Sequence, residues 1–304
     1  MRRRLRVGTR GSPLALAQTG WVIARLKAAW RELEFEPVVV KTEGDLDQDT
    51  PLSEMGGRGV FVRAVERALL SGEVDLAVHS LKDLPARERP GLVLAAVPAR
   101  EDPRDALVTA TGLSLDELPA GALVGTSSPR RRAQLLWRRK DLRCAPLRGN
   151  VETRARRVLR GEFDGAVLAV AGLVRAGLDV PWRPIPIDVM LPAPCQGALA
   201  VQARLGDEEA RAVAAAVEDG EARAAVDAER RLLAALGAGC HTPVAIYCRR
   251  NPASGGWVMD AALFSPGCDE RVSVRRSGDD PRALADEVHS ALRESGAARL
   301  LAGG

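Results

Sequence analysis

The alternation of apolar and polar positions divides the chain into segments with helical period and shorter apolar segments typical of strands. The helical pattern predicts helices over 13–30, 60–71, 130–139, 151–160, 208–219, 221–236 and 281–301. The apolar segments before residue 200 predict strands at 4–9, 36–42, 74–79, 92–97, 106–109, 122–126, 143–147 and 164–170. Because strands and helices alternate in this part of the chain, we expect βαβ units and mainly parallel sheets.

The pattern changes after residue 220. Three runs of strand character follow one another at 244–248, 257–264 and 271–275, and a final helix follows. Runs separated by turn residues are typical of antiparallel pairing. We therefore expect a small C-terminal α+β domain with a three-stranded antiparallel sheet.

One sequence phrase occurs twice, more than a hundred residues apart. Val7-Gly8-Thr9 leads to Ser12-Pro13, and Val124-Gly125-Thr126 leads to Ser128-Pro129. A second pair follows in the same order, with 72–78 echoed by 161–167. We interpret the two halves as related α/β lobes, each with a strand-to-helix turn at the same place.

The repeated turn favours an anionic ligand. Serine is a good helix N-cap, proline fits the first helical position, and the free N–H groups of a helix start attract anions. Three arginines open the second helix, where cations oppose the helix dipole: Arg130, Arg131 and Arg132. A bound polyanion would explain them, and a solvated arginine face is the alternative.

Two proline-containing stretches, 97–104 and 191–197, look like crossings between lobes. They predict a first lobe formed by 1–98 and 198–217 and a second lobe formed by 103–192. The C-terminal domain is expected over 220–304. Two crossings that bound one inserted lobe suggest a hinge, with a ligand cleft between the lobes.

Residues 43–60 form a polar, glycine-rich stretch without periodicity. Long loops inside compact domains are usually functional or mobile, so we expect a lid here; a tolerated insertion is the alternative.

Composition restricts the classes of function. With 46% hydrophobic and 28% charged residues among 304, the chain is typical of soluble globular proteins. A net charge of +4 is too small to indicate nucleic acid, although residues 124–160 hold eleven arginines and one lysine against two acids. That stretch has a single aromatic residue, Trp137, which argues against a platform for single strands. It favours a small acidic ligand.

Cysteine and histidine are placed without the spacing of a metal site, so no metal is expected. Five irregularly spaced cysteines suit reduced thiols in a cytoplasm. We see neither a signal segment nor a membrane-spanning run, and we expect a cytoplasmic protein that does not bind a membrane.

The candidate catalytic group is Asp83, which follows the predicted strand 74–79 beside Ser80 and Lys82. A carboxylate there could stabilise a developing cation or move a proton, and a turn or N-cap aspartate is the alternative. Guanidinium groups bind carboxylates in pairs of hydrogen bonds, so the arginines suit a polycarboxylate. Six could line the cleft: Arg10, Arg130, Arg131, Arg148, Arg154 and Arg175.

Cys240 lies in a glycine-rich loop between a helix and a strand. Small neighbours let a bulky group approach, so the thiol could be a nucleophile or an attachment point. A buried free cysteine is the alternative.

Seven motifs, in order along nearly the whole chain, resemble the porphobilinogen deaminase (hydroxymethylbilane synthase) family. The matching stretches are 9–16, 77–85, 100–106, 125–131, 147–154, 168–173 and Gly239-Cys240 with Pro243. The resemblance implies two lobes like those of type II periplasmic binding proteins, with a third domain that carries the cofactor.

The resemblance also implies an activity. Members of the family condense four porphobilinogen molecules head to tail with loss of ammonia, and hydrolysis gives hydroxymethylbilane for tetrapyrrole and heme biosynthesis. A dipyrromethane cofactor, made from the substrate, would be attached through a thioether at Cys240. Asp83 would assist loss of ammonia and stabilise the azafulvene cation. We expect a monomer with no nucleic-acid partner.

The resemblance further implies which residues bind the acetate and propionate groups. These are the six arginines named above. A fixed tether would occupy one set of cations permanently, so we further predict that Arg130 and Arg131 hold the cofactor, whereas Arg10 and Arg154 face the growing chain. The remaining expected contacts are Ser12, Ser80, Lys82, Thr126, Ser127, Ser128, Arg148, Gly149, Arg175 and Gln196, with Arg58 and Phe61 in the lid.

The sequence departs from the family at a few positions. Glu54 reverses a charge that is commonly positive in the lid, and Cys195 stands where the family usually has glycine. The alternative function is a non-catalytic two-lobed protein that binds a polycarboxylate anion. That alternative leaves Cys240 and the third domain unexplained.

Overall fold

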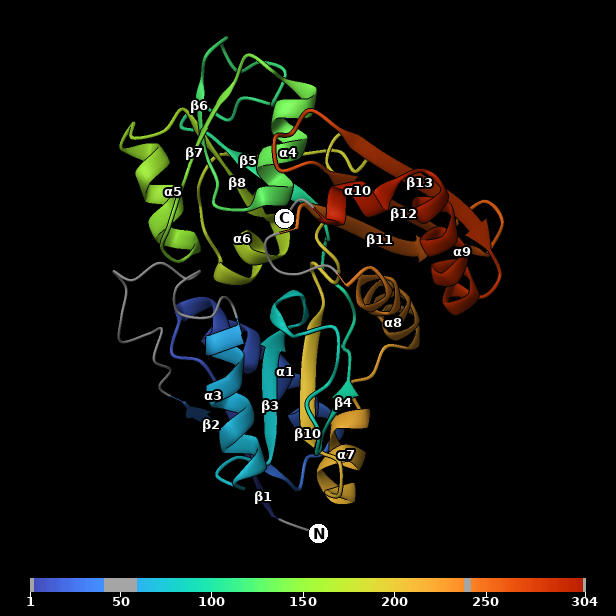
Figure 1. Ribbon diagram of the computed structural model, residues 1–304. Helices are drawn as coiled ribbons and strands as arrows, with labels where there is room; N and C mark the ends of the chain where they lie inside the picture. Colours follow the sequence, from blue (N-terminus) through green and yellow to red (C-terminus); the bar gives the residue numbers. More distant parts are fainter. Residues whose placement is uncertain (1–2, 41–58, 238–241, 303–304) are drawn as a thin grey trace. The chain divides into compact units, whose positions relative to one another are not determined.

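The computed structural model describes residues 3–40, 59–237 and 242–302, with side chains of α3 described from Val62 onward (Figure 1). The chain forms two compact units. The first comprises Met1–Glu101 and Ala198–Arg223, and the second comprises Asp102–Gly197 and Ala224–Gly304. The chain passes between the units three times: at the two proline-containing stretches noted above, and between Arg223 and Ala224 within the helix Gly220–Ala235.

The first unit contains a five-stranded sheet in the order β2-β1-β3-β10-β4. Its strands are β1 (Arg4–Thr9), β2 (Glu34–Val39), β3 (Leu76–Ser80), β4 (Leu92–Ala96) and β10 (Leu199–Arg204). Helices α1 (Pro13–Ala29) and α7 (Glu208–Ala215) bury apolar residues in one core with this sheet. Helix α3 (Gly59–Leu70) packs in a second core that includes Val74 and Ala77.

The second unit contains a sheet in the order β7-β6-β8-β5-β9. Its strands are β5 (Asp105–Val108), β6 (Leu123–Gly125), β7 (Arg143–Ala145), β8 (Gly165–Ala169) and β9 (Trp182–Pro184). Helices α5 (Val151–Leu159) and α6 (Val170–Ala176) share one core with this sheet. Helix α4 (Pro129–Arg138) contributes Leu135 to another.

The two sheets have the same topology. In each, the first three strands are parallel and the fourth, β10 or β5, is antiparallel to its neighbours. Equivalent strands carry the two copies of the repeated phrase, β1 in one sheet and β6 in the other. The prediction of two related α/β lobes is therefore confirmed.

Within each lobe, an aspartate of the second repeated segment (72–78 or 161–167) bonds to the residue just before the first repeated segment. The Arg6 N–H donates to Asp75 Oδ2 at 2.9 Å, and the Asp75 N–H donates to the Arg6 carbonyl at 2.8 Å. In the second lobe the Leu123 N–H donates to Asp164 Oδ2 at 2.6 Å, and the Asp164 N–H donates back at 3.0 Å. This reciprocal pair explains why the two phrases recur together in the sequence.

The repeated segments need glycine at Gly8 and Gly125, because a neighbouring side chain lies close to each backbone there. A Cβ atom on Gly8 would lie 2.9 Å from a methyl group of Val74, and one on Gly125 would lie 2.7 Å from a methyl group of Leu147. Glycine therefore lets the strand that carries each turn pack tightly against its neighbours.

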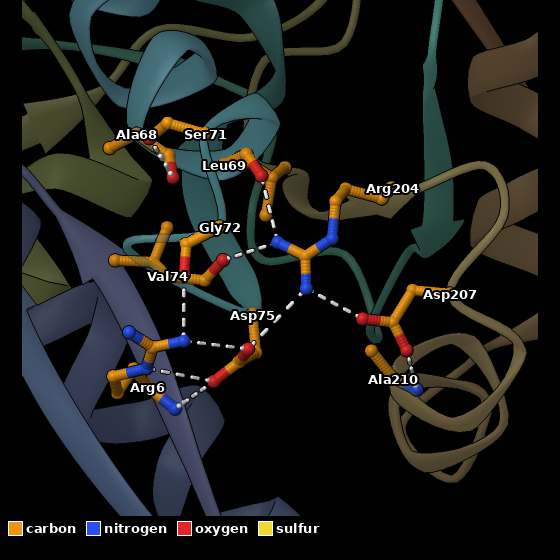
Figure 2. A network of polar contacts seen from close by, with 10 residues as sticks. All are labelled: Arg6, Ala68, Leu69, Ser71, Gly72, Val74, Asp75, Arg204, Asp207 and Ala210. Atoms are coloured by element: carbon orange, nitrogen blue, oxygen red, sulfur yellow. Dashed lines mark hydrogen bonds and ion pairs between the residues drawn. The ribbon is translucent and has the colours of Figure 1, made fainter.

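Asp75 is also the centre of a larger polar network in the first unit (Figure 2). Arg6 approaches it from β1, and Arg204 approaches from β10 with Nη2 at 3.4 Å. Arg204 also donates to the carbonyls of Leu69 and Val74 and pairs with Asp207, which caps α7. The network joins two strands and two helices at the end of the sheet where β1 and β3 begin.

The C-terminal part of the second unit has the predicted three-stranded antiparallel sheet, in the order β11-β12-β13. Its elements are β11 (Val244–Arg250), β12 (Trp257–Phe264), β13 (Arg271–Gly278), α8 (Gly220–Ala235), α9 (Pro281–Glu294) and α10 (Ala297–Ala302). Strand β12 is buried along its whole length. Met259 and Leu263 pack with the helices, whereas Ala262 and Phe264 pack with Ala133 of α4.

The predicted fold class is confirmed, and some elements differ from the predicted ones. Strand β10 was not predicted, because it is buried on both faces and lacks alternation. Helix α6 follows β8 directly, where only a strand was predicted. The last helix is interrupted near Gly296, whose φ of 85° is incompatible with a continuous helix. The three-domain boundaries stay a prediction.

Within the described ranges, no helix combines the length and apolar character needed to cross a membrane. The same residues contain no cluster of three or more histidine, cysteine, aspartate or glutamate side chains placed to hold a metal ion.

We predict that the two aspartates of the repeat differ in their contribution to stability. Asp75→Asn should lower the free energy of unfolding by about 2 kcal/mol, because it removes the charge that neutralises Arg6 and Arg204 in a partly buried network. Asp164→Asn should cost only about 1 kcal/mol, since Asp164 is exposed and bonds to backbone alone. Denaturant unfolding of both variants tests this, and equal losses would contradict it.

Candidate functional site

The candidate residues lie where the parallel strands of each sheet end. In open α/β sheets this edge is where ligands bind. Thr9 ends β1 and Ser80 ends β3 in the first unit. The antiparallel strand β10 begins at the same edge, because Leu199 pairs with Ser80.

The first repeated turn is built as the sequence predicts. Ser12 caps α1, with its Oγ accepting from the Ala15 N–H at 3.3 Å, and Pro13 occupies the first helical position. The buried hydroxyl of Thr19 donates to Thr9 Oγ1 at 2.7 Å, which fastens the helix to the end of the strand. These contacts place Arg10, which is partly exposed, between the strand and the helix.

Asp83 lies directly after β3, at the end of the short 3₁₀ helix η1 (Leu81–Asp83). Asp83 and Lys82 are partly exposed, as a group that contacts substrate must be. The Ser80 hydroxyl donates to Gln18 Oε1 of α1 at 3.1 Å. This bond joins the motif 77–85 to α1, the helix that begins within the motif 9–16.

His79 connects these motifs electrostatically. Burial lowers the pKa of His79 to about 4, although the Asp83 carboxylate and the Gln202 amide act in the opposite direction. The charge of Arg10 lowers this pKa further. Both Asp83 and Arg10 therefore act on one buried, neutral imidazole, which is 6% exposed.

The second repeated turn uses its hydroxyl groups to hold its own shape. Ser128 caps α4 by accepting from the Arg131 N–H at 3.4 Å. The Ser127 hydroxyl donates to the Leu147 carbonyl and accepts from the Leu147 N–H, both at 3.0 Å. Thr126 Oγ1 accepts from the Ser128 N–H at 3.2 Å. Their predicted contacts with a ligand stay a prediction.

Arg130 and Arg131 share one buried carboxylate, that of Asp105. Arg130 Nη2 lies 2.8 Å from Asp105 Oδ2, and Arg131 Nη2 lies 2.7 Å from Oδ1. Burial would raise the pKa of Asp105, but the two guanidinium groups outweigh it and lower the pKa to about 2. Asp105 is 0% exposed and starts β5, at the sheet edge where β8 ends.

The same cluster fastens both crossing segments. Gln196 donates through Nε2 to the Pro103 carbonyl at 2.8 Å and to Asp105 Oδ1 at 2.9 Å. Arg130 Nη1 donates to the Leu191 carbonyl at 2.5 Å, and Gln134 bonds to both the N–H and the carbonyl of Leu191. The candidate residue Gln196 is therefore part of the arginine cluster.

The remaining candidates of the second unit follow β7 and β8. Arg148 and Gly149 are exposed in the loop before α5, and Arg154 Nε donates to the Gly149 carbonyl at 2.7 Å. Arg175 on α6 donates through Nη2 to the Gly197 carbonyl at 3.0 Å. Arg148 and Gly149 lie in the loop after β7, and Arg175 lies near the end of α6, which follows β8 directly; both strands pair in parallel with β6.

Much of the charge in the basic stretch 124–160 is balanced by acids. Four surface arginines form ion pairs with nearby carboxylates, in the pairs Arg138–Asp116, Arg139–Asp141, Arg156–Glu152 and Arg157–Glu162. The acids at 116 and 162 add to the two within the stretch. The stretch is therefore less positive than the sequence alone suggested.

Sequence reasoning missed two residues. Asp105 lies in a recognised motif but received no role; its signal is a lone acid at the start of an apolar strand. His79 lies in another motif, and its burial was not apparent from the sequence. The candidates Arg58 and Cys240 lie outside the described residues, and the side chain of Phe61 does too.

The structure fits a multiply charged carboxylate ligand. Each unit presents cationic and hydroxyl-bearing turns at the carboxyl edge of an α/β sheet. Guanidinium groups held by buried hydrogen bonds provide donors of fixed direction, as carboxylate recognition requires. The arrangement defines an α/β protein whose two sheets carry cationic and hydroxyl-bearing turns at their carboxyl edges, a donor set of the kind that recognises carboxylates.

Two family models match the chain. The model described as "Porphobilinogen deaminase, dipyromethane cofactor binding domain" matches residues 5–212, and "Porphobilinogen deaminase, C-terminal domain" matches residues 223–294. The first alone covers more than half of the chain.

Curated relatives agree with these models. The porphobilinogen deaminase of Rubrobacter xylanophilus is 47% identical over 298 residues, which cover 98% of this chain and 96% of that protein. The porphobilinogen deaminase of Brevibacillus brevis is 43% identical with the same coverage of each chain. The chain belongs to the porphobilinogen deaminase family. The predicted enzyme class, its place in tetrapyrrole biosynthesis and its dipyrromethane cofactor are confirmed, and the binding-protein alternative is not favoured.

Solved structures show only distant similarity. The methionine-binding protein MetQ is 15% identical with a TM-score of 0.45, covering 73% of this chain and 92% of that one. The effector-binding domain of BenM with benzoate is 14% identical with a TM-score of 0.41, covering 69% and 87%. Similarity at this level carries no argument about function.

We predict that His79 makes stability depend on pH. The unfolded chain binds a proton near pH 6.5, whereas folded His79 binds one only near pH 4, so its contribution is complete above 6.5 and is lost as the pH falls toward 4. The difference in unfolding free energy between the parent and His79→Gln should therefore shrink by about 3 kcal/mol from pH 7 to pH 4. Denaturant titrations at several pH values measure it, and a difference that does not change with pH would refute the prediction.

Proposed function

We propose that this chain condenses four porphobilinogen molecules head to tail and releases hydroxymethylbilane, with Asp83 as the catalytic residue. The observation that carries the proposal is the position of Asp83 just after the carboxyl end of β3. The charges of Asp83 and Arg10 both act on His79, so the two residues belong to one site. Membership of the family supports the reaction, and the sheet edge supports the location.

Asp83 provides the negative charge that the reaction requires. Loss of ammonia from porphobilinogen leaves positive charge on the pyrrole, and a fixed carboxylate nearby lowers the energy of that state. The same carboxylate can accept the ring proton once the new carbon–carbon bond has formed. Because His79 is buried with a lowered pKa, it does not add a competing positive charge at neutral pH.

The arginines bind the side chains of the pyrrole rings. Each porphobilinogen brings an acetate and a propionate, so every added unit requires further cationic donors. Arg130 and Arg131 are buried and held rigidly, which suits a permanently bound group. Arg10, Arg148 and Arg154 are more exposed and suit units that arrive and shift during the reaction.

Cys240 is proposed as the thioether attachment point of the dipyrromethane. When bound, this group supplies a covalent tether that keeps the growing chain from leaving. Helix α8 and strand β11 flank the attachment loop and share the buried carboxylate of Glu229, which accepts from the Cys248 N–H at 2.9 Å. This contact supports a firmly held base for the loop.

The proposal extends to the state of the enzyme in the cell. We propose a cytoplasmic monomer that binds neither nucleic acid nor membrane. The described cysteines support a reducing compartment, because Cys144, Cys195, Cys248 and Cys268 form no disulfide bond with one another.

We predict that Asp83→Asn keeps the fold but loses at least about 10²–10³ in turnover, because the substitution is isosteric and removes only the charge and the proton acceptor. Turnover is followed as hydroxymethylbilane formation, and Asp83→Glu, which retains the charge, serves as the control. A folded Asp83→Asn chain with more than half of the parent activity would make Asp83 a structural turn residue.

We predict that the intact mass of the purified chain exceeds its sequence mass by two pyrrole units. Cys240→Ser should lack the excess, whereas Cys195→Ser should retain it, because only Cys240 lies in the family motif Gly239-Cys240 with Pro243. Mass spectrometry of the intact chain and of its peptides measures both. An active chain without added mass, or an adduct at Cys195, would overturn the attachment site.

A further inference from the structure

Asp105 has no part in the proposed reaction, yet it forms ion pairs with both predicted cofactor arginines and accepts a hydrogen bond from Gln196. Its carboxylate receives Arg131 Nε at 3.0 Å and Arg131 Nη2 at 2.7 Å on one oxygen. The other oxygen lies 2.8 Å from Arg130 Nη2. A single carboxylate thus sets the position of two guanidinium groups.

Backbone carbonyls fix the direction of those groups. Arg131 Nη1 donates to the Val167 carbonyl of β8 at 2.8 Å, and Arg130 Nη1 donates to the Leu191 carbonyl of the returning crossing at 2.5 Å. Each guanidinium plane is therefore defined by Asp105 on one side and a carbonyl on the other. Planar groups held in this way are oriented before a ligand arrives, which lowers the cost of binding it.

Removal of the Asp105 charge would alter this arrangement in a definite direction. Arg130 and Arg131 are 5% and 7% exposed, and both approach the same carboxylate, so they would become adjacent buried cations without it. Like charges in a poorly solvated site repel strongly. The side chains would be expected to turn away from each other and toward solvent.

We propose that Asp105 is a positioning residue that holds Arg130 and Arg131 in the orientation needed to bind the carboxylates of the dipyrromethane during assembly of the holoenzyme. This inference rests on the proposed function, in which those two arginines bind the cofactor. Two other accounts make different predictions. Asp105 could be a purely structural ion-pair partner, or it could compete with the cofactor carboxylates for the arginines.

The first unit offers a matched control. Asp75 is also a buried aspartate that neutralises two arginines, Arg6 and Arg204, from different strands (Figure 2). It lies at the opposite end of its strand from the binding turns. Asp75→Asn should therefore remove a buried carboxylate that neutralises two arginines without touching the cofactor residues.

The experiment measures cofactor assembly rather than turnover. Full-length apo chains, produced in cells unable to make porphobilinogen, are incubated with porphobilinogen, and the gain of two pyrrole units is followed by intact mass. Asp105→Asn should load at least about tenfold more slowly than the parent, as expected for weakened charge-assisted contacts. Asp75→Asn should load at the parent rate, and Asp105→Glu should fall between the parent and Asp105→Asn.

The outcomes separate the accounts. Asp105→Asn loading at the parent rate overturns the proposal in favour of a structural ion pair, and faster loading overturns it in favour of competition. Equal slowing in Asp75→Asn also overturns it, because general loss of stability would then explain the effect. If Asp105→Asn does not fold, the loading rate of Asp105→Glu is compared with that of Asp75→Glu. Equal loading rates for these two variants overturn the proposal.

Arg131→Gln distinguishes failure of this inference from failure of the proposed function. If Arg131→Gln loads at the parent rate, the arginine does not bind the cofactor and the proposed function of the cluster is wrong. If Arg131→Gln loads slowly while Asp105→Asn loads normally, the arginine role stands and only the positioning role of Asp105 is wrong.

Discussion

The structure depends on the register with which β1 pairs with β3 in the first lobe and β6 pairs with β8 in the second. Pairing of β1 with β3 and of β6 with β8 brings the carboxyl ends of these strands to one edge. Asp75 and Asp164 add reciprocal contacts at the opposite end of these strands. The candidate turns that follow β1, β3, β6 and β8 take their positions from the strand pairing itself.

The antiparallel fourth strand of each sheet brings a crossing segment to the edge where the parallel strands end. Because β5 and β10 run in the opposite direction, they begin where the parallel strands end. The crossing segments that lead into these strands therefore arrive beside the binding turns. Asp105 and Gln196 exploit this in the second unit, where they join both crossings to α4 through Arg130 and Arg131.

The buried titratable groups of the two units differ in charge: Asp105 is ionised, whereas His79 is neutral. In the second unit two cations share one ionised carboxylate, whose pKa they lower to about 2 despite burial. In the first unit burial keeps His79 neutral by lowering its pKa to about 4. The first arrangement leaves a net positive charge in the cluster, whereas the second avoids placing an extra cation near Asp83.

Local signals in the sequence were sufficient for the caps and the turns. Ser12 and Ser128 cap their helices as predicted, since capping depends on a few adjacent residues. Strand β10 escaped prediction because burial on both faces removes alternation. The roles of Asp105 and His79 depend on partners far away in the chain, which only the folded structure brings together.

The central claim is that this chain builds a covalently tethered pyrrole chain at the site described. Native mass spectrometry of the purified holoenzyme, mixed with limiting porphobilinogen, tests it most directly. The account predicts a ladder of covalent adducts that rises one pyrrole unit at a time, up to four units, and then returns to the starting mass as product leaves. A single unchanged covalent mass, with porphobilinogen bound only reversibly, would contradict it.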